Sequence, residues 1–223
     1  MTDFPSHQDP SKYREEYRKQ DIGKQYSGIR HLLITTSIVA LVLIYGILNL
    51  RNLHVNELII VPITIILGNL TVYLIHRFPM HRKLNAIYFI FRNHTLIHHY
   101  LFDENSMEYE STKDFKMILL SPLLISIVLS LLILPSHFLF RYLFTDNVGF
   151  LLLMAGTLYM GIYEWMHLSF HTPKDHWVNG IPGISWMRRH HTIHHRKAIM
   201  SKVNFNIVFP LSDFIFKSLR RSL

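Results

Sequence analysis

Cysteine is absent from this 223-residue chain. Its absence excludes a disulfide framework, a thiolate nucleophile and thiolate metal ligands, so nitrogen or oxygen atoms would have to hold any metal. The chain also lacks a Gly-rich dinucleotide fingerprint, and its first 30 residues lack both a haem-ligating pair and the apolar core of a cleaved signal peptide. Electrons for a redox reaction would therefore have to come from a separate protein.

The apolar residues stand in long blocks rather than in the short periodic runs of a soluble fold. Four blocks approach the roughly 20 residues that a helix needs to cross a bilayer, and they cover residues 31–50, 56–75, 117–134 and 148–166. Pro62 and Pro122 fall inside two of them, which transmembrane helices tolerate. We therefore predict an all-α integral membrane protein with about four transmembrane helices. Residues 1–30 would form a cytoplasmic, partly helical lead-in, and residues 31–223 one membrane-embedded domain.

The positive charge is distributed unevenly around these blocks. The formal net charge is +8, and all of the 23 lysines and arginines except Arg51 and Arg141 precede the first block, lie between the second and third, or follow the fourth. The positive-inside rule then places both termini and residues 76–116 in the cytoplasm. The basic balance thus indicates topology and attraction to anionic lipid head groups, and we expect no nucleic-acid partner.

Eleven of the 16 histidines gather in two polar segments, which follow the second and fourth apolar blocks. Their motifs are HRFPMH (76–81), HTLIHH (94–99), HLSFH (167–171) and HHTIHH (190–195). All eleven fall on the predicted cytoplasmic side, so the blocks would deliver both sets to one depth in a histidine-rich helical cap. The isolated histidines, which we expect to be surface or interfacial residues, are His7, His31, His54 and His137.

The spacing of the clustered histidines favours convergence. Residues three or four apart share one face of a helix, and the pairs with this spacing are His94 with His98, His167 with His171, His191 with His194 and His191 with His195. His76 and His81 are five apart across Pro79, so this pair needs a turn after a helix end to converge. The cations that flank the last motif disfavour protonation, which leaves neutral imidazoles able to bind a metal.

The number of imidazoles indicates two metals, because zinc usually takes four ligands and ten are present. Imidazole suits zinc, copper, iron and nickel, so the ligand type does not select the metal. The membrane location narrows the choice, since lipid alkyl chains are the nearest substrate and oxidising their C–H bonds needs a redox-active metal and O2. This favours a di-iron oxygenase. The alternatives are a pH-sensing cluster or proton relay and a divalent-metal transporter or sensor, against which the nearly charge-free interiors of the apolar blocks argue.

The four motifs, in this order, resemble the signature of the membrane fatty acid hydroxylase and sterol desaturase superfamily, whose members are histidine-rich di-iron enzymes. The resemblance runs from about residue 65 to the C-terminus. YLIHRFPMH and the segment from HLSFHTPKDH to HHTIHH are similar to the fatty acid 2-hydroxylase branch. Two features depart from the pattern: three residues separate His94 from His98 where that branch usually has two, and Ser212 precedes Asp213 where the family has a Trp-Asp motif.

The resemblance implies a set of site residues. The implied metal ligands are His76, His81, His94, His98, His99, His167, His171, His191, His194 and His195. His190 is an alternative to His191 as the first ligand of the last motif, and we favour His191. His176 also matches a family position, as a further ligand or as a donor to a ligand. Independently of the resemblance, we expect Glu164, Asp175 and Asn93 to hydrogen-bond to ligands. For Glu164 the alternative is a helix-end residue that faces lipid head groups.

The resemblance also implies a reaction. Two Fe ions would be the cofactor and O2 the co-substrate, with zinc able to occupy the site in purified protein. The expected activity is hydroxylation of a C–H bond in the acyl chain of a membrane lipid, with desaturation or ether-lipid monooxygenation as alternatives. A separate ferredoxin or cytochrome-type carrier with its reductase would supply electrons, and a basic cytoplasmic face suits an acidic carrier. The absence of an evident retention signal favours a bacterial inner membrane over the endoplasmic reticulum for this multi-pass protein.

Overall fold

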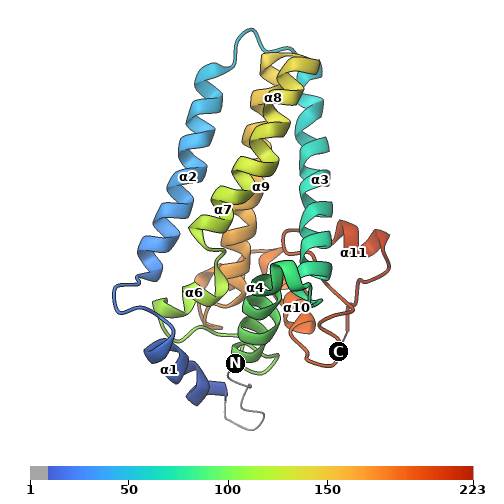
Figure 1. Ribbon diagram of the computed structural model, residues 1–223. Helices are drawn as coiled ribbons and strands as arrows, with labels where there is room; N and C mark the ends of the chain where they lie inside the picture. Colours follow the sequence, from blue (N-terminus) through green and yellow to red (C-terminus); the bar gives the residue numbers. More distant parts are fainter. Residues whose placement is uncertain (1–9, 223) are drawn as a thin grey trace.

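The computed structural model describes residues 10–222, and within them it contains helices and no strand. The predicted all-α fold class is confirmed. Four helical segments are long and apolar enough to cross a membrane, and they are Gly28–Asn49, Val55–Met80, Thr112–Leu143 and Asp146–Phe170. Figure 1 shows these segments running side by side, with the shorter helices collected at one end of the bundle.

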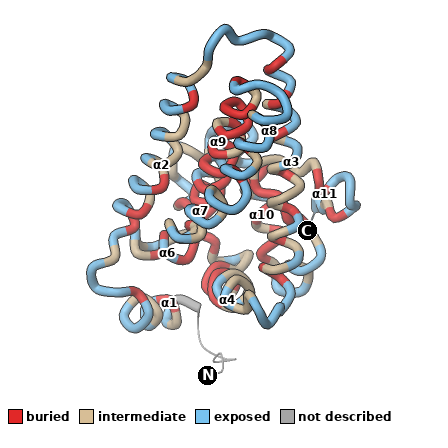
Figure 2. The backbone as a smooth tube through the Cα atoms, turned by 45° about the horizontal axis from the view of Figure 1, so that its top comes forward, coloured by how far each residue is buried: buried red, intermediate tan, exposed pale blue. Residues whose placement is uncertain are grey.

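The helix bounds place the crossing segments in chain order. The elements are α2 (Gly28–Asn49), η1 (Val55–Ile59), α3 (Ile60–Ile75), α7 (Pro122–Val128), η6 (Leu129–Ile133), α8 (Leu134–Leu143) and α9 (Asp146–Phe170). Of these, α9 is central: 67% of the residues in its most apolar window are buried, against 17–28% in the other three segments. The buried stretch along α9 is visible in Figure 2. The other three segments contact α9 on one face and expose apolar side chains on the other, as expected for helices that face lipid.

The third crossing helix differs from the predicted block 117–134. The chain leaves the helical conformation at residues 119–121, and the crossing helix then continues from α7 through the π-helix η6 to α8. Ser121 caps α7 by accepting a hydrogen bond from the N–H of Leu124, and Pro122 occupies the first turn. A proline is suited to that position because its missing N–H would have no intrahelical partner. The apolar residues before the break therefore belong to the histidine-bearing end of the molecule.

Short helices build that end, which we call the histidine cap and define as residues 76–118 and 167–218. Its elements are η2 (His76–Met80), η3 (Asn85–Ile87), α4 (Tyr88–Phe91), η4 (Arg92–His98), α5 (His99–Leu101), η5 (Thr112–Asp114), α6 (Phe115–Ile118), η7 (Trp177–Gly180), α10 (Ile184–His194) and α11 (Leu211–Ile215). The N-terminal helix α1 (Pro10–Gln20) packs against α5. The histidine cap thus lies at one end of the bundle, and both ends of the described chain lie there too (Figure 1).

Two of the isolated histidines, which we predicted to be surface or interfacial residues, are buried inside the protein. His31 donates from Nε2 to the carbonyl of Leu120 and accepts at Nδ1 from the hydroxyl of Tyr26, so its ring ties α2 to the break at residues 119–121. His137 is buried within α8. The structure exposes His54 as expected, and the prediction for His7 lies outside the described residues.

Candidate metal centre

Two π-helices orient the histidines of the first polar segment. Hydrogen bonds in a π-helix link residues five apart, so His76 and His81, at the start and C-cap of η2, lie on one face with their ring centroids 5.1 Å apart. In η4 the same geometry brings the Nε2 atoms of His94 and His99 within 3.1 Å. His94 therefore pairs with His99, and the predicted four-residue pairing with His98 is wrong because the local helix is π and not α.

The second polar segment uses ordinary helix ends. His167 lies in the last turn of α9 and His171 is its C-cap residue, while His191 and His194 lie in the last turn of α10 and His195 caps it. Because α10 packs against α9, the rings of His167 and His191 meet with centroids 4.9 Å apart.

The ten predicted ligands form two groups of five, and within each group the possible ligand atoms lie within 4.8 Å of one another. Group A contains His76, His81, His94, His99 and His194, and group B contains His98, His167, His171, His191 and His195. Chain neighbours are therefore divided between groups. His191 converges with His195 and not with His194, so one of its two predicted pairings is wrong. The groups adjoin, since the rings of His99 and His195 stack with centroids 4.2 Å apart.

Backbone carbonyls determine which nitrogen carries the hydrogen in six of these rings. A carbonyl oxygen only accepts, so a ring whose Nδ1 contacts one must carry its hydrogen on Nδ1 and its lone pair on Nε2. In group A the carbonyls are those of Phe205 for His76 and Val203 for His194. In group B they are those of Met117, Ile118, Met107 and Phe102, for His98, His167, His171 and His195 respectively.

A hydroxyl fixes a seventh ring. Thr95 donates its hydrogen to the carbonyl of Met80, so its oxygen accepts the Nδ1–H of His81 at 3.1 Å. Seven Nε2 lone pairs consequently point into the two groups, which is the arrangement that metal-bound histidines with outer hydrogen-bond partners adopt.

The facing lone pairs provide a test of whether metal fits. The Nε2 atoms of His81 and His194 are 3.0 Å apart, and those of His98 and His195 are 3.2 Å apart. All four rings carry their hydrogen on Nδ1, so neither pair can form a hydrogen bond between its Nε2 atoms, and a cation between the lone pairs would relieve their repulsion. Within the described chain, the buried Nε2 atoms of His167 and His171 also have no hydrogen-bond partner. The donor set of each group therefore fits a metal ion.

Burial keeps the clustered imidazoles neutral. Loss of hydration, reinforced by the neighbouring imidazoles, lowers the pKa of His195 to about 3 and that of His81 to about 2. The same causes lower the pKa well below its ordinary value in His94, His98, His99, His171, His191 and His194. These rings consequently offer lone pairs at neutral pH without first having to release a proton.

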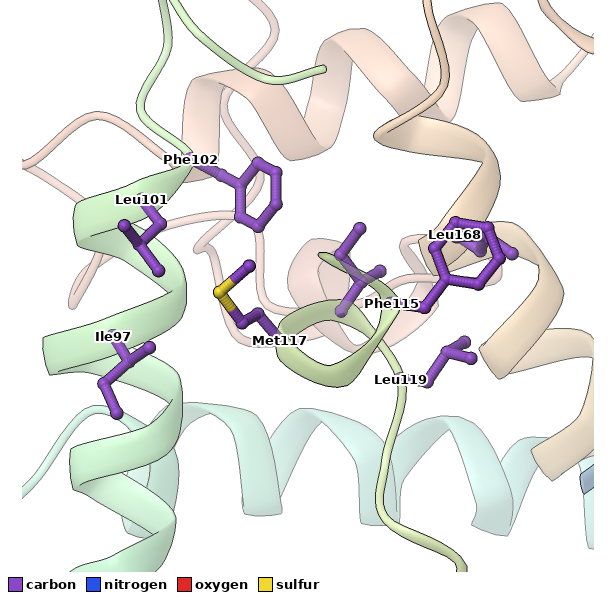
Figure 3. Packing of buried hydrophobic residues seen from close by; sticks show 8 residues of the cluster. Ile97, Leu101, Phe102, Phe115, Met117, Leu119 and Leu168 are labelled. Atoms are coloured by element: carbon purple, nitrogen blue, oxygen red, sulfur yellow. The ribbon is translucent and has the colours of Figure 1, made fainter. Parts of the chain in front are cut away.

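Group B takes all four of its carbonyl partners from residues 102–118. An apolar cluster anchors this segment, and Figure 3 shows Phe102, Phe115 and Met117 in one cluster with Ile97 of η4 and Leu168 of α9. Asp114, fully buried, accepts the N–H groups of residues 110 and 111 and pairs with Arg18 of α1 through two bonds of 2.5 and 2.7 Å. The N-terminal helix therefore holds the segment that orients group B.

Arg14 of α1 strengthens this attachment. Its guanidinium is fully buried and donates to the carbonyls of Leu101, Ser106 and Glu108. It also lies over the ring of Phe102 at 4.7 Å, the residue whose carbonyl accepts from His195. A single arginine thus satisfies several carbonyls of the loop that orients group B.

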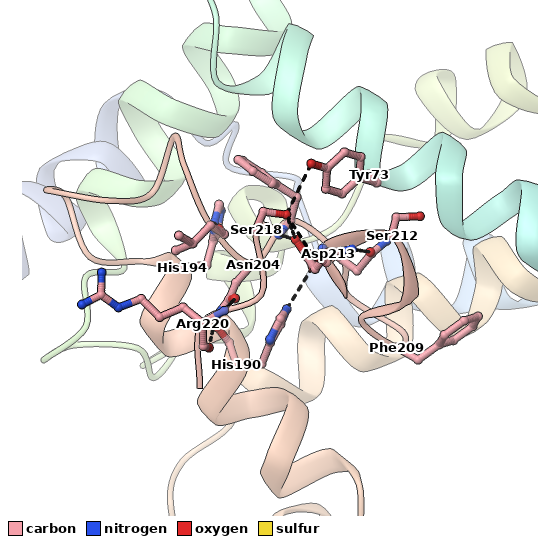
Figure 4. A network of polar contacts seen from close by, with 12 residues as sticks. Tyr73, His190, His194, Asn204, Phe209, Ser212, Asp213, Ser218 and Arg220 are labelled. Carbon is pink, nitrogen blue, oxygen red and sulfur yellow. Dashed lines mark hydrogen bonds and ion pairs between the residues drawn. The ribbon is translucent and has the colours of Figure 1, made fainter. Parts of the chain in front are cut away.

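Group A takes its two carbonyl partners from the C-terminal segment, in the network of Figure 4. The buried carboxylate of Asp213 accepts hydrogen bonds from the N–H groups of Phe205 and Asn206, from the hydroxyl of Ser218 and from Nε2 of His190. Burial alone would raise the pKa of this carboxyl, but His190 and the N–H groups of Asn206 and Phe205 outweigh burial and hold the pKa below its usual range.

Asn69 of α3 ties the same segment to the bundle. This fully buried amide donates to the carbonyl of Phe209 and accepts from both the N–H and the hydroxyl of Ser212. Ser212, which stands where the resembling family has tryptophan, therefore serves as a hydrogen-bonding anchor here.

The remaining predicted site residues lie outside both groups. His190 contacts Asp213 at 3.2 Å and not the cluster, which separates it from His191, and His176 uses its Nδ1 to cap η7. Glu164 is buried, but its carboxylate accepts the N–H of Leu120 at 3.1 and 3.2 Å. Within residues 10–222, Glu164 forms no hydrogen bond to any of the ten imidazoles, and neither do the exposed residues Asp175 and Asn93.

The residues that do orient the ligands were missed from sequence. Six are backbone carbonyls, which any residue type carries, so no side-chain pattern could have marked them. Thr95, one residue after His94, is a hydroxyl inside a histidine motif and could have been noticed. Arg14 and Asp114 carry a weaker signal. They are charged residues of two segments that lie far apart in the sequence and meet only in the folded protein.

Two cavities reach the metal centre. The polar cavity, of about 630 Å³, is bordered by His94, His98 and His167. The apolar groove, of about 570 Å³, follows α3 from Ile60 to His76 and is closed by α7, η6 and α9. Members of both histidine groups therefore border space that a substrate could enter.

The sequence was also compared with known proteins. The sequence model of the family described as fatty acid hydroxylase matches residues 61–218. Searches of curated proteins and of solved structures found no match. The matched range contains all ten histidines of groups A and B and the segments that supply their carbonyl partners.

Proposed function

Since the chain belongs to the fatty acid hydroxylase family, we propose that it is a membrane-bound di-iron enzyme that uses O2 to hydroxylate a C–H bond of a lipid acyl chain. The observation that carries the proposal is the pair of five-imidazole groups, which lie beside an apolar groove that His76 of group A borders. The ligands would be the five histidines of group A for one iron and the five of group B for the other.

Bound iron would supply the oxidation of an unactivated C–H bond, which zinc cannot perform because it has no redox chemistry. The net reaction combines R–H, O2, two electrons and two protons to give R–OH and water. The protein's own contribution is to hold the imidazoles in fixed tautomers through Thr95 and the six carbonyls. Its groove would orient the alkyl chain and exclude water from the reacting carbon.

Desaturation and ether-lipid monooxygenation remain alternatives within this chemistry, because the same oxidant gives either outcome according to which hydrogens the substrate presents. The similarity to the 2-hydroxylase branch supports hydroxylation. A divalent-metal transporter or sensor is the alternative of another class, and it would place ligands along a path through the bundle. The ten histidines instead lie at one end, which supports the enzyme.

We further propose that the histidine cap faces the cytoplasm, on the basis of the distribution of lysines and arginines. An acidic ferredoxin or cytochrome-type carrier, with its reductase, would then deliver electrons to the basic face of the cap.

The direct test is elemental analysis of the detergent-purified protein, made under iron-replete conditions, together with lipid analysis of cells that express it. We expect two irons per chain and a hydroxylated acyl product that disappears when His98, His99, His194 and His195 are all changed to alanine. Zinc or copper alone, or metal that survives in the variant, would contradict the proposal.

A further inference from the structure

The two cavities share part of their walls. Met80, Ile90, Leu120, Leu124 and Tyr163 line both the polar cavity and the apolar groove. The two cavities therefore adjoin. The groove also reaches His76 of group A, and the polar cavity reaches His94 of group A and His98 and His167 of group B.

The groove has the dimensions and exposure of an alkyl-chain site. From Ile60 to His76 it follows 16 residues of helix, which at 1.5 Å per residue is about 24 Å. Leu67 and Leu132 line it and remain 53% and 47% exposed, so the groove opens sideways toward lipid. The alkyl chain of a lipid could therefore enter the groove directly from the bilayer, without passing through the polar cavity.

The polar cavity has an excess of positive charge. Arg30, Arg92 and Lys116 line it, against the single carboxylate of Asp21. Lys116 donates to the backbone carbonyl of Asp21 at 3.0 Å, and Arg30 donates to the carbonyl of Gln25 at 3.0 Å. Neither cation is neutralised by an ion pair in the described chain, so both can attract an anion.

We propose that the joined cavities bind an amphiphile with an anionic head group, a carboxylate or a phosphate, held among Arg30, Arg92 and Lys116, with its alkyl chain in the apolar groove. Members of both histidine groups border the polar cavity, which holds the head group, so the carbon presented to the metals lies near the head group and not at the methyl end. This inference rests on the proposed function for the reaction, but the binding itself does not require turnover.

The first experiment measures binding to the full-length protein in phosphatidylcholine nanodiscs. Hexadecanoate represents a free carboxylate, phosphatidylglycerol a lipid phosphate, and hexadecanol a neutral chain of equal length. We expect at least one anion to bind at least tenfold more tightly than hexadecanol, and the tighter one identifies the source of the head group. Equal binding of all three would overturn the inference, as would the absence of binding.

A charge-matched pair of variants tests the residues. The triple variant Arg30→Gln, Arg92→Gln, Lys116→Gln should lose at least tenfold in affinity for the preferred anion and keep its affinity for hexadecanol. The control is Lys24→Gln, Lys83→Gln, Lys202→Gln, which removes the same charge from exposed positions outside both cavities and should bind like the unchanged protein. Equal losses of affinity in the two triple variants would show that the effect comes from surface charge in general, and would overturn the inference.

The groove is tested by filling it. Gly156 lines it 11 residues before His167, about 16 Å along α9, and a Cβ there would meet Ile133 at an ordinary 3.6 Å. Gly156→Phe should weaken hexadecanoate binding at least tenfold and leave octanoate binding unchanged. Leu158→Phe, on α9 but outside the groove, is the control. Unchanged hexadecanoate binding in Gly156→Phe would exclude the groove as the chain site.

Metal content, measured in every preparation, separates this inference from the proposed function. Protein with two irons that fails to discriminate between the amphiphiles contradicts the anionic-head inference and leaves the di-iron proposal standing. Protein that binds the anion selectively but contains no iron supports the inference and contradicts the di-iron proposal.

Discussion

Group A and group B have the same number of imidazoles, yet different segments of the chain orient them. Group A depends on carbonyls of residues 203–205, which Asp213 and Asn69 hold. Group B depends on carbonyls of residues 102–118, which Asp114 and the arginines of α1 hold. In both, a buried aspartate organises a loop and the loop organises the rings. The difference teaches that the two groups can be perturbed separately, although their members are interleaved along the sequence.

The largest expected effect comes from removing ligands of one group at a time. His99→Ala with His194→Ala should remove the metal of group A, and His98→Ala with His195→Ala the metal of group B. Each double variant changes immediate chain neighbours of the other, so the pair is internally controlled. We expect one metal per chain in each by elemental analysis and no hydroxylated product from either. Loss of both metals in each variant would show that the groups form one inseparable site.

Asp213→Asn should have the next largest effect. It weakens the acceptor of several buried donors, which costs about 3–5 kcal/mol when one partner of a buried charged network is lost. The affinity of group A for metal should fall about 10–100-fold, since its carbonyl partners are displaced. Chelator competition and thermal unfolding in detergent measure the two effects.

The control for Asp213→Asn is Asp175→Asn at an exposed position, which should change neither quantity. If Asp213→Asn lowered the affinity of group B for metal as much as that of group A, the division between the two supporting segments would be contradicted.

Arg14→Met tests the segment that orients group B, and should have the third largest effect. Methionine keeps much of the buried volume but removes the donors to residues 101, 106 and 108, so the loop that orients His195 and His171 should loosen. We expect the affinity of group B for metal to fall about tenfold or more and that of group A to stay unchanged, measured by chelator competition. Lys12→Met, at an exposed position of the same helix, is the control. Unchanged group B affinity would mean that α1 plays no part in positioning the metal.

Thr95→Val should have the smallest effect. The change preserves shape but removes the acceptor for the Nδ1–H of His81, at a cost of about 1 kcal/mol in stability and about tenfold in the affinity of group A for metal. Thr192→Val, which removes a hydroxyl bonded within α10, should leave metal affinity unchanged. A loss confined to group B would contradict the assignment of His81 to group A.

Local pattern was sufficient for much of the fold, and the motifs with their family resemblance named the ten histidines that the structure brings together. Apolar blocks longer than a soluble helix needs predicted four crossing segments, because hydrocarbon requires about 20 apolar residues of helix. Boundaries were less accurate: the third segment breaks at residues 119–121, where Ser121 and Pro122 start a new helix. Hydropathy averages over a window and does not register a cap.

Pairing within the centre was less predictable. Four-residue spacing in an α-helix favoured His94 with His98, but η4 is a π-helix, and its wider turn pairs His94 with His99. The choice between α and π depends on how the surrounding helices pack, because a π turn is intrinsically less favourable and survives only where other contacts stabilise it.

By itself, therefore, the sequence determined the chemistry that is available: a membrane-embedded helical protein without thiols, carrying clustered neutral imidazoles at one end of its spans. Only the tertiary structure decided how ten histidines divide into two groups, which backbone carbonyls fix their tautomers, and which cavities meet beside them. The physical reason is that residue type and spacing are local properties. A carbonyl of residue 205 or a guanidinium at residue 14 acquires its role only when folding brings it, across more than 80 residues of chain, against a ring or the loop that holds it.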